Sequence, residues 1–157
     1  GREVTGVTPK LAMAGGFLLH GGKMLLASRF EDYIEFETAL DADARLTPLA
    51  RLLAEREKYG VGQEELSSYS LRYFDIFADL IPAVRSFREP YCHKGSDPLQ
   101  YRLSALLYLA DAMARSWKIP TDEKDPVLLE WAHPSLKVLR LKPKTLVTVM
   151  KTAMTSR

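Results

Sequence analysis

The sequence predicts an all-α fold in a single domain, and three observations support that prediction. Apolar residues recur three and four positions apart through most of the 157 residues, as they do on the buried face of an amphipathic helix. Thr8-Pro9 and Thr47-Pro48 each place a capping side chain directly before a proline, the arrangement that opens helices. No segment alternates apolar and polar residues long enough to favour a strand. A chain of this length can also bury a core of its own.

The first predicted helices flank a run of glycines. One helix should begin at Thr8-Pro9 and end near His20. Gly21-Gly22 then allows a backbone turn that bulkier residues would resist. A second helical segment should begin at Lys23 or Met24 and end near Arg29. A third, over Phe30 to Ala42, is predicted from three apolar residues at helical spacing: Tyr33, Phe36 and Leu40.

The middle of the chain predicts further helices separated by a glycine. Thr47-Pro48 opens a helix that runs to Tyr59, and Gly60 stands where a helix terminator is expected. The predicted buried stripe of this helix is Leu49, Leu52 and Leu53. The next helix, Gln63 to Phe74, carries on one side Leu66, Tyr69 and Tyr73. The apolar pattern then continues through Phe77, Leu80, Ile81, Val84 and Phe87, in which Pro82 is tolerable only near a helix start or at a kink.

The strongest helical pattern follows a predicted loop over Pro90 to Ser96. Asp97-Pro98 opens a helix that extends to Trp117, which we expect to be the central element of the core. Its apolar stripe consists of Leu99, Leu103, Leu106, Leu107, Ala110, Met113, Ala114 and Trp117. Pro120 and the charged run Asp122 to Asp125 should end it. Shorter helices are predicted over Val127 to Trp131, Ser135 to Leu139 and Thr145 to Met154.

Composition indicates a soluble protein of a reducing compartment, and a cytoplasmic location is the default. The chain is 46% hydrophobic and 27% charged, with a net charge of +2 that does not by itself argue for nucleic acid. Its single cysteine, Cys92, excludes an internal disulfide, and we interpret Cys92 and His93 as loop residues without chemistry. The apolar run from Leu11 to Ala27 is interrupted by glycines, His20 and Lys23, so no membrane span or secretion signal is expected.

Two charge clusters are interpreted as solvated surfaces. The acidic one comprises Glu31, Asp32, Glu35, Glu37, Asp41 and Asp43, and its alternative role is docking to a basic partner. The basic one comprises Lys137, Arg140, Lys142, Lys144, Lys151 and Arg157, the only charges after Pro134. We do not expect it to bind nucleic acid, because no aromatic platform or recognition motif accompanies it. Nucleic-acid binding stays open as an alternative that neutralising Lys142, Lys144 and Lys151 would test.

Several segments, taken in order, resemble the HD-related output domain, HDOD, a helical signalling relative of the HD metal-dependent phosphohydrolases. Ala14-Gly15-Gly16-Phe17-Leu18-Leu19-His20-Gly21-Gly22-Lys23 resembles the family's Leu-Leu-His-Asp-x-Gly-Lys pattern, without the aspartate and shorter by one residue. Glu55-Arg56-Glu57-Lys58-Tyr59-Gly60-Val61 is similar to its E-x-E-x-[FY]-G segment. Leu107 to Arg115 resembles its long helix, including the aspartate that ligates metal in active enzymes. In place of family histidines this chain has Gln63 and Phe87-Arg88-Glu89-Pro90.

The resemblance spans about Pro9 to Ala153 and implies an HD-like helical bundle, with residues 1–157 as one HDOD-like domain whose upstream part is missing. Of the family's metal ligands it leaves only two vestigial candidates, His20 and Asp111. Two ligands do not make the usual catalytic metal site, so we predict no catalytic residue, no cofactor and no bound metal. We expect His20 to bond a backbone carbonyl at a helix end, and Asp111 to pair with Lys23 or Arg115.

The resemblance therefore implies a regulatory module rather than an enzyme. HDOD domains are typically bacterial output domains that work through protein contacts, so the expected partner is another protein or a fused signalling domain. A homodimer is also compatible with this interpretation. The first alternative is a divergent metal-dependent HD phosphohydrolase that uses His20, Asp111 and ligands not recognised in the sequence. No serine or glycine-rich motif supports a hydrolase triad or a nucleotide site.

Overall fold

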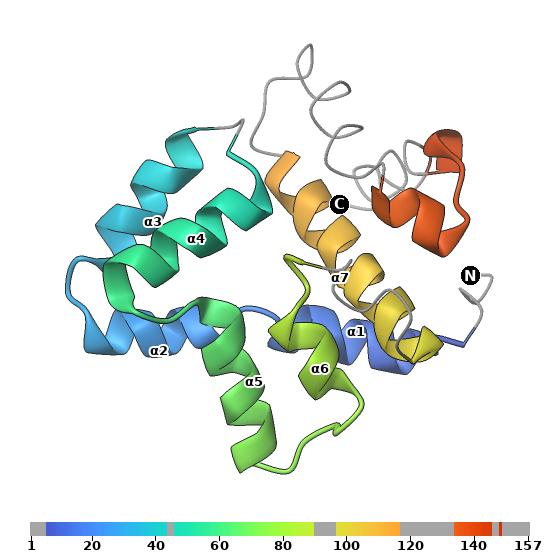
Figure 1. Cartoon of the computed structure of the whole chain (residues 1–157), viewed down its shortest axis with the longest axis horizontal. Helices are drawn as coiled ribbons and strands as arrows, with labels where there is room; N and C mark the ends of the chain where they lie inside the picture. The colour runs from blue at the N-terminus through green and yellow to red at the C-terminus, as the bar shows by residue number, and fades with distance from the viewer. Residues whose placement is uncertain (1–5, 44–45, 90–96, 117–133, 146–147, 149–157) are drawn as a thin grey trace.

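The computed structural model describes residues 6–43, 46–89, 97–116, 134–145 and 148 (Figure 1). Within these ranges the chain is all-α, as its apolar periodicity predicted, and no described residue belongs to a strand. The labelled helices are α1 (Pro9–Leu18), α2 (Gly21–Arg29), α3 (Tyr33–Ala42), α4 (Pro48–Tyr59), α5 (Gln63–Tyr73), α6 (Leu80–Arg85) and α7 (Pro98–Ser116). A further helical segment covers residues 134–139, where a short helix was predicted.

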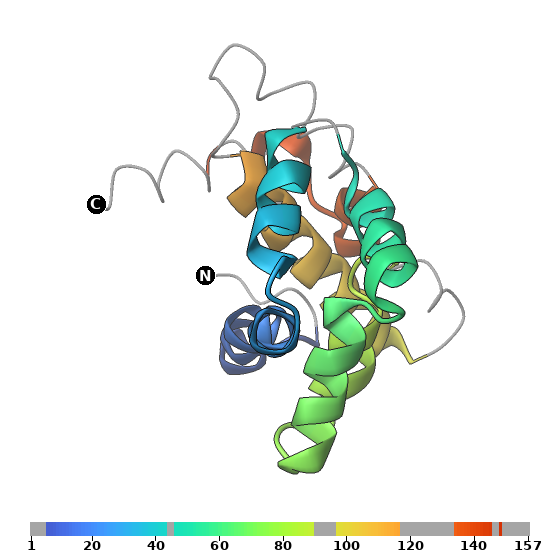
Figure 2. The same cartoon turned by 90° about the vertical axis from the view of Figure 1, so that its left-hand side faces the viewer.

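The helix α7 runs through the middle of the molecule, and the other helices are arranged around it (Figures 1 and 2). Both α1 and α6 pack against α7, α5 packs on α6, and α2 packs on α5. Aromatic rings join α3 to α4, since the Tyr59 ring lies 5.5 Å from that of Tyr33 and 5.2 Å from that of Phe36. The long helix is therefore the central element, as predicted. Its predicted stripe was wrong at Ala110 and Ala114, which are exposed, whereas Ala105, Leu109 and Ala112 are buried because they face the segment 134–139.

Two apolar clusters share α7. The larger one joins α1, α5, α6 and α7, and its fully buried members include Leu80, Phe87 and Leu103. The smaller one joins α7 to the segment 134–139 through Ala105, Leu109 and residues of that segment. Leu106 is partly buried and packs against both clusters. Substitutions in α7 therefore affect its packing both on α1, α5 and α6 and on the segment 134–139.

The predicted helix signals act as expected at three positions. The Thr8 hydroxyl accepts a hydrogen bond from the Leu11 amide at 3.3 Å, and the Thr47 hydroxyl caps α4 in the same way. Gly60 ends α4 in the left-handed conformation, with φ of 76°. Each signal is local, because a cap needs only neighbouring residues and a suitable backbone conformation.

The role assigned to the glycine pair was wrong. Gly21 and Gly22 are the first residues of α2, which begins earlier than the predicted Lys23 or Met24, and neither has a positive φ. The turn between α1 and α2 consists instead of Leu19 and His20. Gly22 is needed for close packing, since a Cβ there would overlap the carbonyl oxygen of Gln63 on α5. The glycine therefore allows α2 and α5 to approach each other.

The predicted buried faces of α4 and α5 were also wrong. Leu49 and Leu53 are exposed, and of the predicted stripe in α4 only Leu52 is buried. The buried residues of α4 are Pro48, Arg51, Leu52 and Glu55, and those of α5 are Gln63, Glu64, Ser67, Ser68 and Leu71. Tyr69 and Tyr73, predicted on one side of α5, are exposed. Polar side chains can face inward here because they pair with one another across the helices.

The other boundaries need only small corrections. The helix α3 begins at Tyr33 rather than Phe30, because Phe30 is extended and its amide closes α2 by bonding the Leu26 carbonyl. Pro82 is the third residue of α6, where a proline is tolerated. None of the described helices is long and apolar enough to cross a membrane. The predictions that lie outside the described residues concern Pro90 to Ser96 with Cys92 and His93, Trp117, Pro120, Asp122 to Asp125, Val127 to Trp131, Lys151, Arg157 and most of Thr145 to Met154.

Candidate functional site

The fold brings together His20 and Asp111, the two candidates singled out in the sequence. His20 directly precedes α2, Asp111 lies on α7, and Nε2 of His20 is 3.4 Å from Oδ1 of Asp111. Nδ1 of His20 lies 3.3 Å from Oε1 of Gln63 on α5. The expectation that His20 bonds a backbone carbonyl was wrong, because these helices bring two side-chain oxygens to its ring. His20 thus connects three helices through polar contacts.

Asp111 is paired within its own helix. Nε of Arg115, one turn further along α7, donates to Oδ2 of Asp111 at 2.9 Å. Of the two predicted partners, Arg115 is the one observed, whereas Lys23 forms an ion pair with Glu37 of α3. Because Arg115 also donates to Asp41 at 3.3 Å, its guanidinium joins α7 to α3. The space beside the Asp111 carboxylate thus holds a protein cation.

The surroundings of His20 and Asp111 lower the pKa values of both groups. Burial would raise the pKa of Asp111, but the Arg115 guanidinium and the His20 ring outweigh it and hold that pKa below its usual value. Burial lowers the pKa of His20, although Asp111 opposes this. Near neutral pH the pair is therefore an aspartate beside a neutral imidazole. The structure supplies Asp111 with a positive partner without requiring His20 to be protonated.

Arg51 and Asp41 extend this charge network to α4. Nη1 of Arg51 donates to Oδ1 of Asp41 at 2.8 Å, and Nη2 donates to the Leu40 carbonyl at 2.6 Å. Burial lowers the pKa of Arg51, and neighbouring Arg115 lowers it further. The two guanidiniums share one carboxylate, so Asp41 holds the ends of α4 and α7 against α3.

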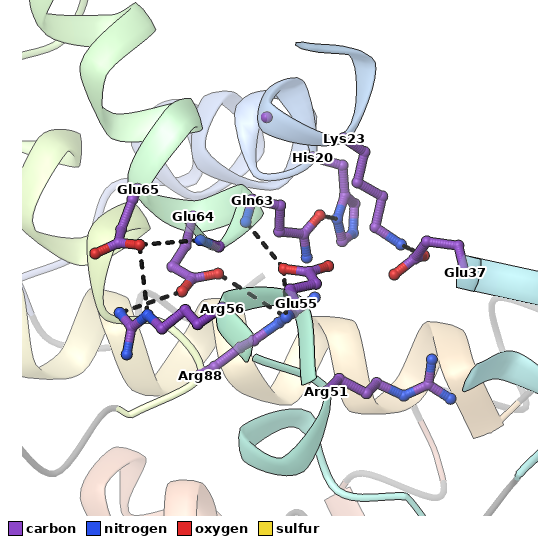
Figure 3. A network of polar contacts seen from close by, with 12 residues as sticks. His20, Lys23, Glu37, Arg51, Glu55, Arg56, Gln63, Glu64, Glu65 and Arg88 are labelled. Carbon is purple, nitrogen blue, oxygen red and sulfur yellow. Dashed lines mark hydrogen bonds and ion pairs between the residues drawn. The ribbon is translucent and has the colours of Figure 1, made fainter. Parts of the chain in front are cut away.

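A second cluster, which the sequence did not single out, consists of Glu55, Glu64 and Arg88 (Figure 3). The side chains of all three are completely buried. Oε2 of Glu55 accepts from Nη1 of Arg88 at 3.2 Å and from the Gln63 amide at 2.9 Å, and Oε1 accepts from the Tyr33 hydroxyl at 3.1 Å. Glu55 thereby joins α3, α4 and α5 to the segment after α6.

Glu64 is the least well compensated member of this cluster. Its nearest cations are Nη2 of Arg56 at 3.5 Å and Nη1 of Arg88 at 3.9 Å, and neither of its oxygens accepts a hydrogen bond from a described residue. Burial raises the pKa of Glu64 to about 7, against the opposing effect of Arg88. One guanidinium therefore lies between two buried carboxylates, of which Glu64 is the one that readily takes up a proton.

Gln63 connects the two clusters, since its side chain contacts His20 and its backbone amide donates to Glu55, and Ser67 on the same helix supports the residues beside His20. The Ser67 hydroxyl accepts from the Gly22 amide at 2.7 Å and donates to the Leu19 carbonyl at 3.1 Å. These two hydrogen bonds satisfy backbone groups at the short junction between α1 and α2, where His20 lies. The sequence offered no signal for Ser67 beyond its place on a polar helix face.

The arrangement around His20 is a set of internal ion pairs rather than an assembled metal-ligand set. Over the described residues, no group of three or more histidine, cysteine, aspartate or glutamate side chains converges in a way that could hold a metal ion. His20 and Asp111 supply two donor groups, and a catalytic metal site ordinarily has three protein ligands and an open position. The chemistry available to these residues is proton exchange at His20 and Glu64.

The two surface charge clusters differ from each other. Glu37 and Asp41 of the acidic cluster face Lys23, Arg51 and Arg115, so the prediction that the whole cluster is solvated was wrong. The other four acidic residues are exposed: Glu31, Asp32, Glu35 and Asp43. Lys137, Arg140, Lys142 and Lys144 of the basic cluster are exposed, as predicted.

No protein-family model, curated protein or solved structure matches this chain. The resemblance to HDOD domains therefore depends on the quoted segments alone.

Proposed function

We propose that the chain is a degenerate HDOD domain and acts as a non-catalytic regulatory module through contacts with other proteins. The order of three sequence segments supports the family assignment, and each segment contributes a residue to the charge networks between the helices. His20 belongs to the first segment, Glu55 to the second and Asp111 to the third. The regulatory role is what the resemblance implies.

One observation carries the non-catalytic part of the proposal: the two vestigial ligands are engaged by the protein's own side chains. Asp111 is 4% exposed and is held by Arg115, and His20 lies between Asp111 and Gln63. A divalent cation at Asp111 would have to displace or approach the Arg115 guanidinium. Like charges in a poorly solvated site repel strongly, so metal binding there is disfavoured.

The surface supports a role in protein contacts. Several large apolar side chains of α1 and α5 are mostly exposed, among them Met13, Phe17 and Tyr73. Contiguous exposed apolar groups on a soluble protein commonly mark a place where another molecule binds. The domain would transmit a signal by favouring one packing arrangement with its partner over another.

Metal analysis tests the non-catalytic part of the proposal. The purified chain would be dialysed against Mn²⁺, Fe²⁺ or Zn²⁺ and its metal content measured by inductively coupled plasma mass spectrometry. We expect substoichiometric metal that does not change in His20→Ala. One equivalent of metal that is lost in His20→Ala, together with phosphoester hydrolysis that needs it, would instead establish the divergent HD phosphohydrolase.

A genetic comparison tests the regulatory part. In a strain whose only copy encodes His20→Gln, we expect the transcript profile of the wild type, because no chemistry at the ring is required. Phe17→Glu, which alters an exposed side chain, should give the profile of a deletion strain. The opposite ranking of the two variants would contradict a role in protein contacts.

A further inference from the structure

An apolar hollow of about 420 Å³ lies between α1 and the segment that joins α5 to α6. Figure 1 shows both elements on the lower side of the molecule, away from α3 and α4. We call this feature the α1 hollow, and its apolar walls are Met13, Ala14, Phe17, Leu18, Ile76 and Phe77. Lys10 stands at its edge. A site for a small polar ligand would need convergent polar groups, which these walls do not offer.

An aromatic ridge adjoins the α1 hollow at the end of α5. Tyr73 and Phe74 form it, with ring centroids 5.1 Å apart and the rings nearly perpendicular. Phe17 is 88% exposed, Tyr73 84% and Met13 74%. Large apolar side chains are usually buried. An aromatic pair that projects from the end of a helix into water is therefore an uncovered apolar surface.

The exposed area is large enough for a stable interface. At about 200 Å² for a large side chain, the exposed parts of Met13, Phe17, Tyr73, Phe74, Ile76 and Phe77 amount to about 800 Å². One partner contributes about 800 Å² to a protein interface of standard size. The largest apolar patch of a typical monomer is about 300–600 Å², so this surface exceeds what a monomer ordinarily leaves in water.

The backbone of the joining segment holds the hollow in shape. Asp75 and Phe77 have φ of 50° and 49°, in the left-handed region that side chains other than glycine rarely adopt. A tight turn begins at Phe77, whose carbonyl accepts a hydrogen bond from the Leu80 amide at 2.7 Å. This conformation places Ile76 and Phe77 against α1 rather than in the apolar core.

The charges around the hollow and ridge have both signs in equal number. Lys10 and Arg72 are exposed cations, and Asp75 and Asp79 are exposed carboxylates. None of the four forms an ion pair with another described residue. A surface that binds an acidic or basic partner carries mainly the opposite sign, whereas balanced charges suit a surface that meets itself. A two-fold interface requires such self-complementarity, because each group on one copy faces a different group on the other.

From these observations we infer that the α1 hollow and the aromatic ridge form the interface of a homodimer. The ridge of one copy inserts into the hollow of the other about a two-fold axis, and each Lys10 lies near the acidic segment around Asp75 of the partner copy. Phe74 of the ridge and Ile76 of the hollow are two residues apart in the chain, so a two-fold axis beside this segment would allow both insertions at once. This inference goes beyond the regulatory role and does not depend on it, since a catalytic or a non-catalytic domain could dimerise in this way.

Sedimentation velocity and light scattering of the full chain across the micromolar range would test the inference. The wild type should show a concentration-dependent dimer with twice the monomer mass of 17.7 kDa. Phe17→Glu should be monomeric throughout that range. Ile34→Glu is the matched control, because Ile34 is an exposed apolar residue of α3, 61% exposed and outside the hollow. Circular dichroism would establish that both variants keep the wild-type helix content.

Three results would overturn the inference. They are a wild type that stays monomeric, a dimer that persists in Phe17→Glu, and a dimer that is lost equally in Ile34→Glu. A monomeric wild type whose Phe17→Glu variant still loses the regulatory phenotype would assign the surface to a different protein. In that case the proposed function would stand and the homodimer would not.

Discussion

Glu64 gives the protein a pH-dependent stability that can be calculated from the structure. The carboxyl is completely buried, its closest cation is 3.5 Å away, and its folded-state pKa is about 7. In the unfolded chain its pKa returns to about 4.5. A group whose pKa is raised by folding stabilises the protein below the unfolded pKa, and this contribution is lost as the pH rises through the folded pKa.

The size of the effect follows from the two values. Each pKa unit corresponds to about 1.4 kcal/mol, so the full contribution of Glu64 is about 3 kcal/mol, and about 2 to 3 kcal/mol of it is lost between about pH 5 and pH 8. His20 acts in the opposite direction, since its lowered pKa removes stability as the pH falls. The contribution of Glu64 must therefore be isolated by comparison with a variant.

Glu64→Gln keeps the shape of the side chain and removes its titration. Urea unfolding followed by circular dichroism at several pH values would give the free energy of unfolding of each protein. We expect the wild type and Glu64→Gln to converge at the acidic end, and the variant to be about 2 to 3 kcal/mol more stable than the wild type near pH 8. Glu57→Gln, a change on the exposed face of α4, should follow the wild-type curve.

A difference between Glu64→Gln and the wild type that is the same at every pH would contradict a raised pKa of Glu64 in the folded protein. That result would mean that Arg88 and Arg56 compensate the ionised Glu64 carboxylate fully. If Glu57→Gln changed the pH dependence as much as Glu64→Gln does, the assay would report total charge rather than burial.

Three further predictions, two on packing and one on the α4 cap, can be tested by the same unfolding assay. Gly22→Ala should lower the free energy of unfolding by about 3 kcal/mol or more, because the added methyl meets the backbone of α5. Its control, Gly16→Ala on the open side of α1, should raise that free energy by up to about 1 kcal/mol, and equal effects of the two changes would place the close contact elsewhere. Leu106→Ala should cost about 2 to 3 kcal/mol because it removes contacts with both apolar clusters, and a change near zero would remove Leu106 from the core. Thr47→Ala should cost about 1 kcal/mol through loss of the α4 cap, with Thr47→Ser near the wild type; an unchanged Thr47→Ala protein would show that water replaces the hydroxyl.

The cluster of Glu55, Glu64 and Arg88 explains how the fold tolerates charges in its interior. Glu55 alone accepts from α3, α5 and the segment after α6, so its removal would leave Arg88 without its closest anion. Breaking a buried pair on one side is costly because the remaining charge is unpaired. These residues therefore hold the helices in one relative arrangement, which any regulatory change of packing would have to alter.

Local sequence determined most of the helices. The caps at Thr8 and Thr47, the terminator Gly60 and the apolar stripe of α7 each depend on residues within a few positions of one another. Interactions of that range are present whatever the rest of the chain does, so they can be deduced from the order of residues. The central place of α7 followed from the length of its stripe alone.

Only the tertiary structure decided which face of α4 and α5 is buried. Helical periodicity shows which residues share a side, and on α4 both the leucine side and the side with Arg51 and Glu55 were available. The charged side lies inside because Glu55 meets Arg88, 33 residues further along the chain. Likewise, His20 and Asp111 meet only because α2 and α7 are brought together by the packing of the other helices. The energy of burying a charge depends on partners distant in sequence, and no local pattern contains them.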